Sequence, residues 1–528
     1  MSTWDREPPR DAAPPWIASP PPPPLPPPPP VLRPPPPPPP SGTPSGAPGP
    51  YGPPPWAPAP VRPRRRWPIV AVAVVAVAGL GGAAAVAMRA DDGHPDEWDR
   101  RVADLAAFVE AERGLTFDHP VTVEFVSDDE YSERTRVDES VLTDQDRRHF
   151  EESAAVMTAM GLVPPGTDLL ESRNDLGDSG TLAFYDPTSE RVVVRGDELT
   201  PGLQGTLVHE LTHVLQDQHF DIEDPPIDTP AAWEGHRVLV EGDAVRIEDA
   251  WIAGLPPDER DTYHDEMDSG VEASEADLED VPGALQAQFA VPYIVGGPLV
   301  DLIVAADGNG GVDDAFADPP STSEQFFDPR AYFADDDGVD VDQPGMPDGA
   351  EEVGESGPLG AATLFVMLTE RIDPLVALSA VDGWGGDHSV AYEVDGDTCV
   401  NARIQGDTAA DTEELRLALE SWAAAGPPGV ASVMAADGMV ALGACAPESP
   451  PDDAEAARST RSIDALYVVG SRSQIMLQAE QAGLGHDAAF TAADCFVRSF
   501  SFEEFLALEP EDAMVGEAWS ICGLNDTE

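Results

Sequence analysis

Two histidines and a glutamate stand close together in residues 200–220, which read TPGLQGTLVHELTHVLQDQHF. Residues four apart project from the same face of a helix, so His209 and His213 can give one ring nitrogen each to a single cation. This HExxH spacing is typical of zinc sites, in which ring nitrogens bind at about 2.0–2.1 Å. Zinc lowers the pKa of a bound water towards about 7, and Glu210 would accept its proton. The pattern predicts zinc-dependent hydrolysis with Glu210 as general base.

The flanking residues predict a helix that presents these side chains. Thr200 is a suitable N-cap, and Pro201 fits the first helical position, where its missing N–H costs nothing. One apolar stripe runs along the segment and consists of Leu203, Leu207, Leu211 and Val214. The two histidines project away from this stripe, so the helix can pack on a core and still present them. The alternative is a pair of structural histidines on an amphipathic helix.

A catalytic zinc ion needs a third protein ligand, and two residues could supply it. Glu241 lies in RVLVEGDAV, residues 237–245, where the apolar neighbours indicate burial. His219 has the position of the last histidine in HExxHxxGxxH, but Gln216 stands where that pattern has the glycine that turns the chain. With Gln216 the helix is expected to continue and His219 to point elsewhere. We therefore expect His209, His213 and Glu241 as ligands, with His219 as the alternative third ligand.

These motifs resemble those of zincin metallopeptidases, and a glutamate from a second helix resembles the gluzincin branch. The chain is more closely similar to an uncharacterised group of bacterial, membrane-anchored proteins that carry HELTHxLQDQHF followed by an LVEGDA-like helix. Further shared pieces extend the resemblance to about residues 96–425: FYD at 184–186, VPYIVG at 291–296, PSTSEQ at 320–325 and GWGGD at 383–387. Those relatives tend to have His-Pro after the Glu-Gln stretch, whereas this chain has Asp328-Pro329.

The resemblance implies an α+β, zincin-like fold that is rich in helix and has a small sheet. Its edge strand would lie over the active-site helix and pair with an extended peptide, which fits peptide-bond hydrolysis. Residues 182–185 or residues 191–194 would form that strand, and the turn signal Asp186-Pro187 between them predicts a hairpin. Period-2 alternation predicts another strand at 121–125, and helical spacing predicts helices near 98–109 and 150–160.

Other roles at the site stay open. The oxyanion that forms during hydrolysis needs a hydrogen-bond donor, and four residues could supply it: His236, Tyr185, Tyr263 and Tyr293. Asp217 and Asp243 could orient a ligand histidine by accepting its second N–H, or they could be surface acids.

The composition excludes some functions. The chain has 528 residues, with 98 acidic residues against 29 basic ones, all arginine, and a formal net charge of −69. A nucleic-acid binder needs a basic face to neutralise phosphates, and docking on anionic lipid needs one too. We therefore expect no nucleic-acid partner and no anionic lipid bound by the folded part.

The N-terminal region indicates a membrane anchor. Half of the 58 prolines lie in the first 60 residues, so residues 1–66 are expected to be a disordered cytoplasmic tail, either a spacer or a ligand for a proline-motif reader. Residues 69–88 carry no charge and would cover about 30 Å as a helix, which predicts a transmembrane helix within residues 67–88. Arginines precede this run, which places the C-terminal part outside the cell. A cleaved signal peptide is the alternative.

Four cysteines lie late in the chain, on the predicted outer side. Sequence proximity favours the disulfides Cys399–Cys445 and Cys495–Cys522, and the lack of a CxxC pair argues against zinc binding by cysteine. The expected organisation is a zincin-like domain at 89–425 and a disulfide-bonded region at 426–528.

Together these features predict a single-pass, extracytoplasmic zinc peptidase that acts on a peptide or protein. The alternative is a non-catalytic cell-envelope binding module whose structural zinc has four protein ligands, with His219 as the fourth.

Overall fold

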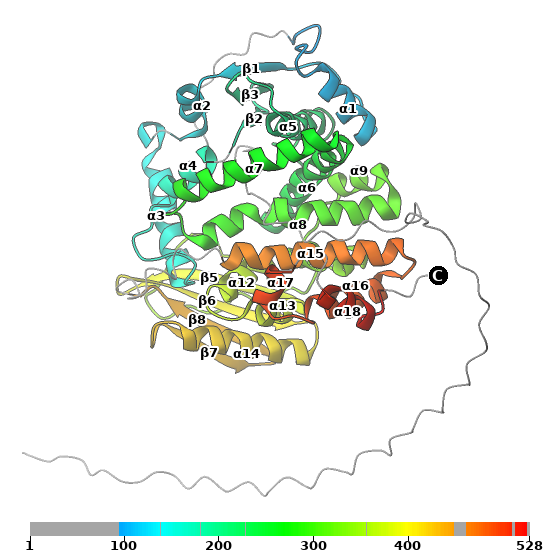
Figure 1. Cartoon of the computed structure of the whole chain (residues 1–528). Helices are drawn as coiled ribbons and strands as arrows, with labels where there is room; N and C mark the ends of the chain where they lie inside the picture. The colour runs from blue at the N-terminus through cyan, green and yellow to red at the C-terminus, as the bar shows by residue number, and fades with distance from the viewer. Residues whose placement is uncertain are drawn as a thin grey trace, which may run out of the picture. The chain divides into compact units, whose positions relative to one another are not determined.

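Two β-sheets and the helices around them form the described part of the chain (Figure 1). The structure is a computed structural model, and it describes residues 94–137, 139–179, 181–227, 229–354, 356–447, 461–508 and 513–524. The predicted proline-rich tail (1–66) and transmembrane helix (67–88) lie outside these residues. The predicted α+β class is confirmed.

The first sheet has three strands in the order β1-β3-β2. They are β1 (Thr122–Val126), β2 (Ala183–Asp186) and β3 (Arg191–Arg195). β3 pairs in parallel with β1 and antiparallel with β2, so the predicted hairpin is confirmed. The expectation that residues 191–194 could be the edge strand is wrong, because β1 pairs with the other side of β3. The edge strand next to the helix at Pro201–Phe220 is therefore β2.

The second sheet has five strands in the order β4-β5-β6-β8-β7, and every pairing is antiparallel. They are β4 (Glu351–Glu352), β5 (Trp384–Val394), β6 (Asp397–Gly406), β7 (Ala431–Ala436) and β8 (Met439–Cys445). Cys399 of β6 lies directly opposite Cys445 of β8, and these two residues form a disulfide, as predicted. The predicted boundary at 425/426 lies between strands that pair in this one sheet.

Helices surround and separate the sheets. Those in the first half are α1 (Ala103–Arg113), α2 (Asp128–Thr135), the 3-10 turn η1 (Glu139–Val141), α3 (Asp144–Ala159), α4 (Leu169–Asp178), α5 (Pro201–Phe220), α6 (Pro230–Gly254) and α7 (Pro257–Asp277). The next helices along the chain are α8 (Gly283–Asp307), α9 (Asn309–Ala317), α10 (Glu324–Phe327), α11 (Pro329–Phe333), α12 (Gly360–Thr369) and α13 (Pro374–Val381). The last are α14 (Ala409–Ala425), α15 (Arg461–Gln481), α16 (His486–Val497), α17 (Phe502–Leu506) and α18 (Ala513–Ile521).

α8 lies between the two sheets in Figure 1 and packs against both α6 and α15. Within the described part of the chain it is the one helix long and apolar enough to cross a membrane, and 61 % of its most apolar window is buried inside the protein. A helix that is apolar on every side is typical of a core position. The largest hydrophobic cluster, which includes residues of α6, α8, α12 and α15, surrounds it.

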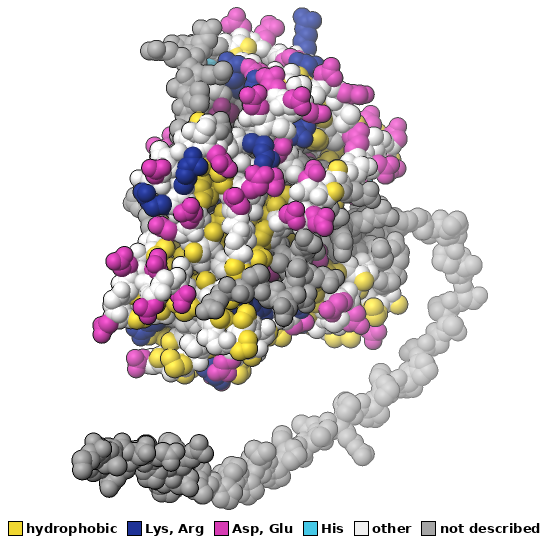
Figure 2. Space-filling view, turned by 90° about the vertical axis from the view of Figure 1, so that its left-hand side faces the viewer, with side chains coloured by type: hydrophobic (Ala, Val, Ile, Leu, Met, Phe, Trp, Pro, Cys, Tyr) yellow, Lys and Arg dark blue, Asp and Glu magenta, His cyan; other side chains and the backbone are white. Residues whose placement is uncertain are grey.

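The helices that sequence patterns predicted are present, with earlier or later ends. α3 begins at Asp144 because Thr143 caps it and forms a reciprocal capping box with Asp146. The second predicted disulfide, Cys495–Cys522, is also present and joins α16 to the residue after α18. Acidic side chains are spread over the face shown in Figure 2, with few arginines between them, in keeping with the net charge.

Candidate metal centre

α5 presents the HExxH residues as the sequence predicted. The Thr200 side chain accepts the Leu203 N–H, and Pro201 opens the helix. The apolar stripe from Leu203 to Val214 joins a hydrophobic cluster with α1 and the first sheet. Burial of that stripe fixes the rotation of α5, so the two histidines face α6. The helix continues to Phe220, past Gln216, as expected.

α6 brings Glu241 to the two histidines. Its Oε2 lies 3.2 Å from Nε2 of His209 and 3.4 Å from Nε2 of His213, and one ligand atom of each residue lies within 4.8 Å of the others. His219 lies apart, at the exposed end of α5, where its Nε2 is 2.9 Å from the carbonyl oxygen of Thr116. Of the two predicted third ligands, the geometry therefore favours Glu241.

A close helix crossing sets the position of Glu241. Gly242 of α6 meets Gly296 of α8, and a Cβ on Gly242 would lie 2.4 Å from the carbonyl carbon of Gly296. Only glycine allows two backbones to approach this closely. The crossing also brings Tyr293 of α8 to Glu241. The Tyr293 hydroxyl donates to Oε1 of Glu241 at 2.9 Å.

The cluster is suited to a cation. His209, Glu210 and His213 are fully buried, and among the described residues neither Nε2 of His213 nor Oε1 of Glu210 has a hydrogen-bond partner. Buried polar atoms normally have a hydrogen-bond partner. Two imidazole nitrogens and a carboxylate oxygen that converge on one point form a donor set that zinc accepts. The residues present therefore fit a zinc ion.

The carboxylates around His209 favour a positive charge in this cluster, as a cation site requires. Burial alone would raise the pKa of Glu241, but the imidazoles of His213 and His209 outweigh it and lower that pKa to about 2. Burial disfavours the charged form of His209, yet Glu241 and Glu248 raise the pKa of His209 to about 10. Burial also raises the pKa of Glu210 well above its ordinary value. Positive charge in the cluster would favour the ionised form of Glu210, which a general base needs.

Gln216 fixes the ring of His213, a role the sequence analysis missed. Its Oε1 lies 2.9 Å from Nδ1 of His213, and its Nε2 donates to the carbonyl oxygen of Val240 at 3.0 Å and to Asp243 at 3.2 Å. Since the amide nitrogen has acceptors, the amide oxygen must face the ring, and Nδ1 carries the hydrogen. Nε2 of His213 then presents a lone pair to the cluster.

Asp243, which could have been either an orienting carboxylate or a surface acid, is buried and acts through Gln216. It contacts Gln216 rather than a histidine, and its carboxylate pairs with Arg113 at 2.8 Å and Arg246 at 3.1 Å. The side chains of Arg113 and Asp243 are fully buried. This ion pair connects α1 to α6 and holds the acceptor that orients Gln216.

Glu248 faces His209 of the cluster, and the sequence analysis did not single it out. Its Oε2 lies 3.3 Å from Nδ1 of His209, and its Oε1 accepts the Tyr263 hydroxyl at 3.0 Å. Glu248 follows Glu241 by two helical turns on α6, so both carboxylates lie on the same face. That spacing was the available sequence signal.

The four residues that could donate a hydrogen bond to the oxyanion lie in different places in the structure. Tyr293 lies at the cluster, where burial keeps the pKa of its phenol well above the ordinary value, so the hydroxyl stays a donor. Tyr263 bonds to Glu248 instead, and His236 Nε2 lies 3.4 Å from the carbonyl oxygen of Ile222. The Tyr185 hydroxyl donates to Asp217 at 2.8 Å. Tyr293 is therefore the best placed of the four.

Asp217 does not orient a ligand histidine, and its partner belongs to the edge strand. Tyr185 of β2 gives its hydroxyl to Asp217 and its backbone N–H to Oε2 of Glu210, at 2.7 Å. The N–H of Tyr185 therefore points away from β3 and towards the cluster. These two bonds hold the free edge of β2 against α5.

The other segments that the sequence analysis singled out divide into two sets. FYD forms β2, and VPYIVG carries Tyr293 and Gly296, so both contribute to the cluster. The remaining pieces stabilise loops: Gln325 accepts the Ser321 N–H, and Asp387 accepts the N–H groups of Leu359 and Gly360. Asp328 pairs with Arg330.

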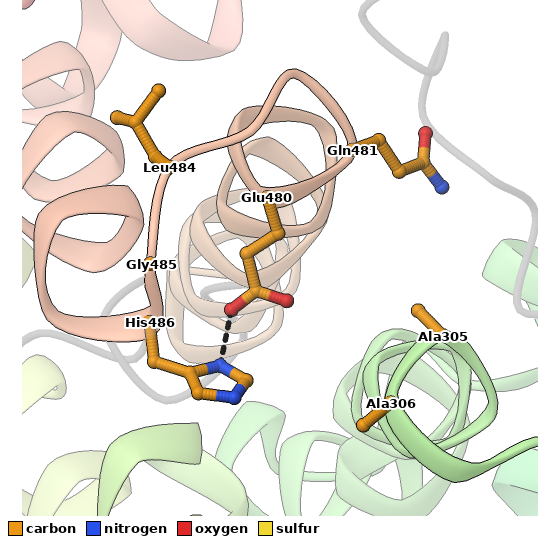
Figure 3. A pocket seen from close by; sticks show the side chains of 7 residues that line it. All are labelled: Ala305, Ala306, Glu480, Gln481, Leu484, Gly485 and His486. Carbon is orange, nitrogen blue, oxygen red and sulfur yellow. Dashed lines mark hydrogen bonds and ion pairs between the residues drawn. The ribbon is translucent and has the colours of Figure 1, made fainter.

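A shallow hollow lies elsewhere, between the ends of α8 and α15 (Figure 3). Seven residues line it: Ala305, Ala306, Glu480, Gln481, Leu484, Gly485 and His486. Its two titratable groups, Glu480 and His486, bond to each other. Ala305 follows Tyr293 by 12 residues, or about 18 Å along α8, so this hollow is separate from the HExxH cluster.

Comparison with protein-family models matches one segment of the chain. A family model described as "Domain of unknown function (DUF8575)" matches residues 351–473, which extend from β4 into α15. The matched segment crosses residue 425 and does not contain the HExxH cluster. No curated protein and no solved structure matches the chain.

Proposed function

We propose that the chain is a zinc-dependent peptidase of the zincin type, held in the cell membrane by residues 67–88 with the catalytic domain outside. The observation that supports this most is the meeting of His209, His213 and Glu241 in one buried cluster beside Glu210. The alternative, a binding module with a closed zinc site, would need a fourth protein ligand. The cluster that the described residues form has three members, and His219 is not one of them.

The side chains present can divide the work of hydrolysis. His209, His213 and Glu241 would hold the zinc ion, which acts as a Lewis acid and makes water nucleophilic near neutral pH. Glu210 would accept a proton at Oε1, the oxygen without a hydrogen-bond partner, and pass it to the departing amine. Tyr293 would donate its hydroxyl hydrogen to the developing oxyanion.

The edge strand β2 would hold the substrate. Its free edge runs beside α5, and main-chain pairing with an extended peptide requires no particular side chains. The N–H of Tyr185 already bonds to Glu210, so binding of a peptide at this edge would compete with that bond. Because the HExxH residues are fully buried, neighbouring elements must move before a peptide reaches them.

The direct test is Glu210→Gln in the full-length protein. The probe substrate is denatured casein carrying a self-quenching fluorescent label, so that cleavage raises the fluorescence. We expect hydrolysis to fall at least about a thousandfold, because the general base is lost while the zinc ligands remain. Zinc content and the melting temperature should stay close to wild type. Glu133→Gln, at an exposed glutamate of α2, is the matched control and should cleave normally. Wild-type protein that holds zinc at this cluster and cleaves nothing would support the binding module instead.

A further inference from the structure

A second group of two histidines and a glutamate lies outside the HExxH cluster. His94, His119 and Glu190 each offer one ligand atom, and these atoms lie within 4.8 Å of one another. Oε2 of Glu190 is 3.3 Å from Nδ1 of His94 and 3.5 Å from Nε2 of His119. The two imidazole rings stack, with centroids 3.4 Å apart, so one ring must turn before both nitrogens can point at a shared cation. Three segments distant in sequence therefore converge on one carboxylate oxygen.

Glu190 has an unusual backbone conformation. It lies in the turn between β2 and β3 with φ at +51°. This is the left-handed backbone region, which residues other than glycine, asparagine and aspartate rarely adopt. This conformation is strained, and such residues cluster at ligand sites. Its Oε2 is shielded from solvent and has no hydrogen-bond partner in the part of the chain that the structure describes, although the side chain as a whole is 41 % exposed. The turn thus holds a desolvated oxygen against two imidazoles.

The backbone around His119 is held firmly. Gln218 of α5 donates from Nε2 to the carbonyl oxygen of His119 at 3.0 Å and accepts the N–H of Asp118 at 2.8 Å. His219 lies against the carbonyl oxygen of Thr116 in the same loop. This loop is therefore tied to the C-terminal end of the helix that carries the HExxH residues.

We propose that His94, His119 and Glu190 form a second zinc site, separate from the HExxH cluster. Two imidazoles and a carboxylate suit zinc better than magnesium or calcium, which prefer oxygen ligands. The ligand side chains are 28–46 % exposed, so water completes the coordination and zinc exchanges easily. A zinc ion here would tie the segment at His94 to the turn that ends β2, and so steady the edge strand.

Zinc counting on the full-length protein tests this site independently of the proposed peptidase activity. The metal-free protein is titrated with zinc sulfate, excess metal is removed, and bound zinc is measured by mass spectrometry. We expect two zinc ions per chain in wild type and one each in His119→Gln and His213→Gln. The double variant should bind none. His264→Gln, at an exposed histidine of α7 in neither group, should bind two.

The outcomes separate the two sites. If His119→Gln and His94→Gln both bind as much zinc as wild type, the second site is refuted and the group is only a carboxylate–imidazole ion pair. If His213→Gln alone binds as much as wild type, the HExxH cluster is refuted instead. His94 and His119 are partly exposed, so their variants should fold, and circular dichroism checks this.

Discussion

The HExxH cluster and the group at His94 contain the same residue types in different surroundings. In the first, two long helices supply the buried side chains, and Gln216 and Glu248 face the second ring nitrogens of the histidines. In the second, loops and a turn supply ligands that are 28–46 % exposed, and Nδ1 of His119 lies 3.4 Å from the carbonyl oxygen of Pro120. Preorganised, buried ligands suit catalysis, whereas exposed ligands on separate segments suit a structural link.

The largest expected effect is on the free energy of unfolding, when the buried ion pair beneath the HExxH cluster is broken. Arg113→Met should destabilise the protein by about 3–5 kcal/mol, because the fully buried carboxylate of Asp243 loses a charged partner. Chemical denaturation of the full-length protein measures this. Arg101→Met, at an exposed pair with Asp99, is the matched control and should cost no more than about 1 kcal/mol. Equal effects of the two variants would show that the ion pair beneath the cluster does not support the fold.

Metal release should distinguish the two sites by rate. Zinc at the HExxH cluster can leave only after local opening, and an opening cost of about 3 kcal/mol slows release by roughly a hundredfold. A colorimetric chelator should therefore remove zinc in a fast and a slow phase of equal amplitude. His119→Gln should abolish the fast phase and His213→Gln the slow one. A single phase in wild type would contradict the difference between the two sites.

A smaller effect is expected from the residue that orients a ligand histidine. Gln216→Leu should weaken zinc binding at the HExxH cluster by about 10–100-fold, because Nδ1 of His213 loses its acceptor. Competition with a chelator of known affinity measures this loss, and the second site should keep its affinity. Gln204→Leu removes a side-chain bond to the start of α5 and serves as the control. Unchanged affinity in Gln216→Leu would mean that the ring needs no such support.

The HExxH cluster was largely predictable because its main signals are local. Two histidines one turn apart on a helix with a clear N-cap must share a face, and the apolar neighbours of Glu241 indicated burial. The role of Gln216 was harder to see, because it depends on how α5 packs on α6. The N-terminal end of α3 was missed because Thr143 and Asp146 extend the helix with a capping box.

The second group could not be predicted from sequence. His94, His119 and Glu190 come from three segments, and no spacing rule relates them. They meet because β3 pairs in parallel with β1, which brings the turn before β3 near the loop before β1. The assignment of β3 as a possible edge strand failed for the same reason, since parallel pairing with β1 is a long-range contact.

The most direct test is anomalous diffraction at the zinc edge on crystals of the full-length protein. We expect a peak between the side chains of His209, His213 and Glu241, with a fourth position that no protein atom fills. No peak there, or a peak with four protein ligands, would contradict a catalytic zinc site.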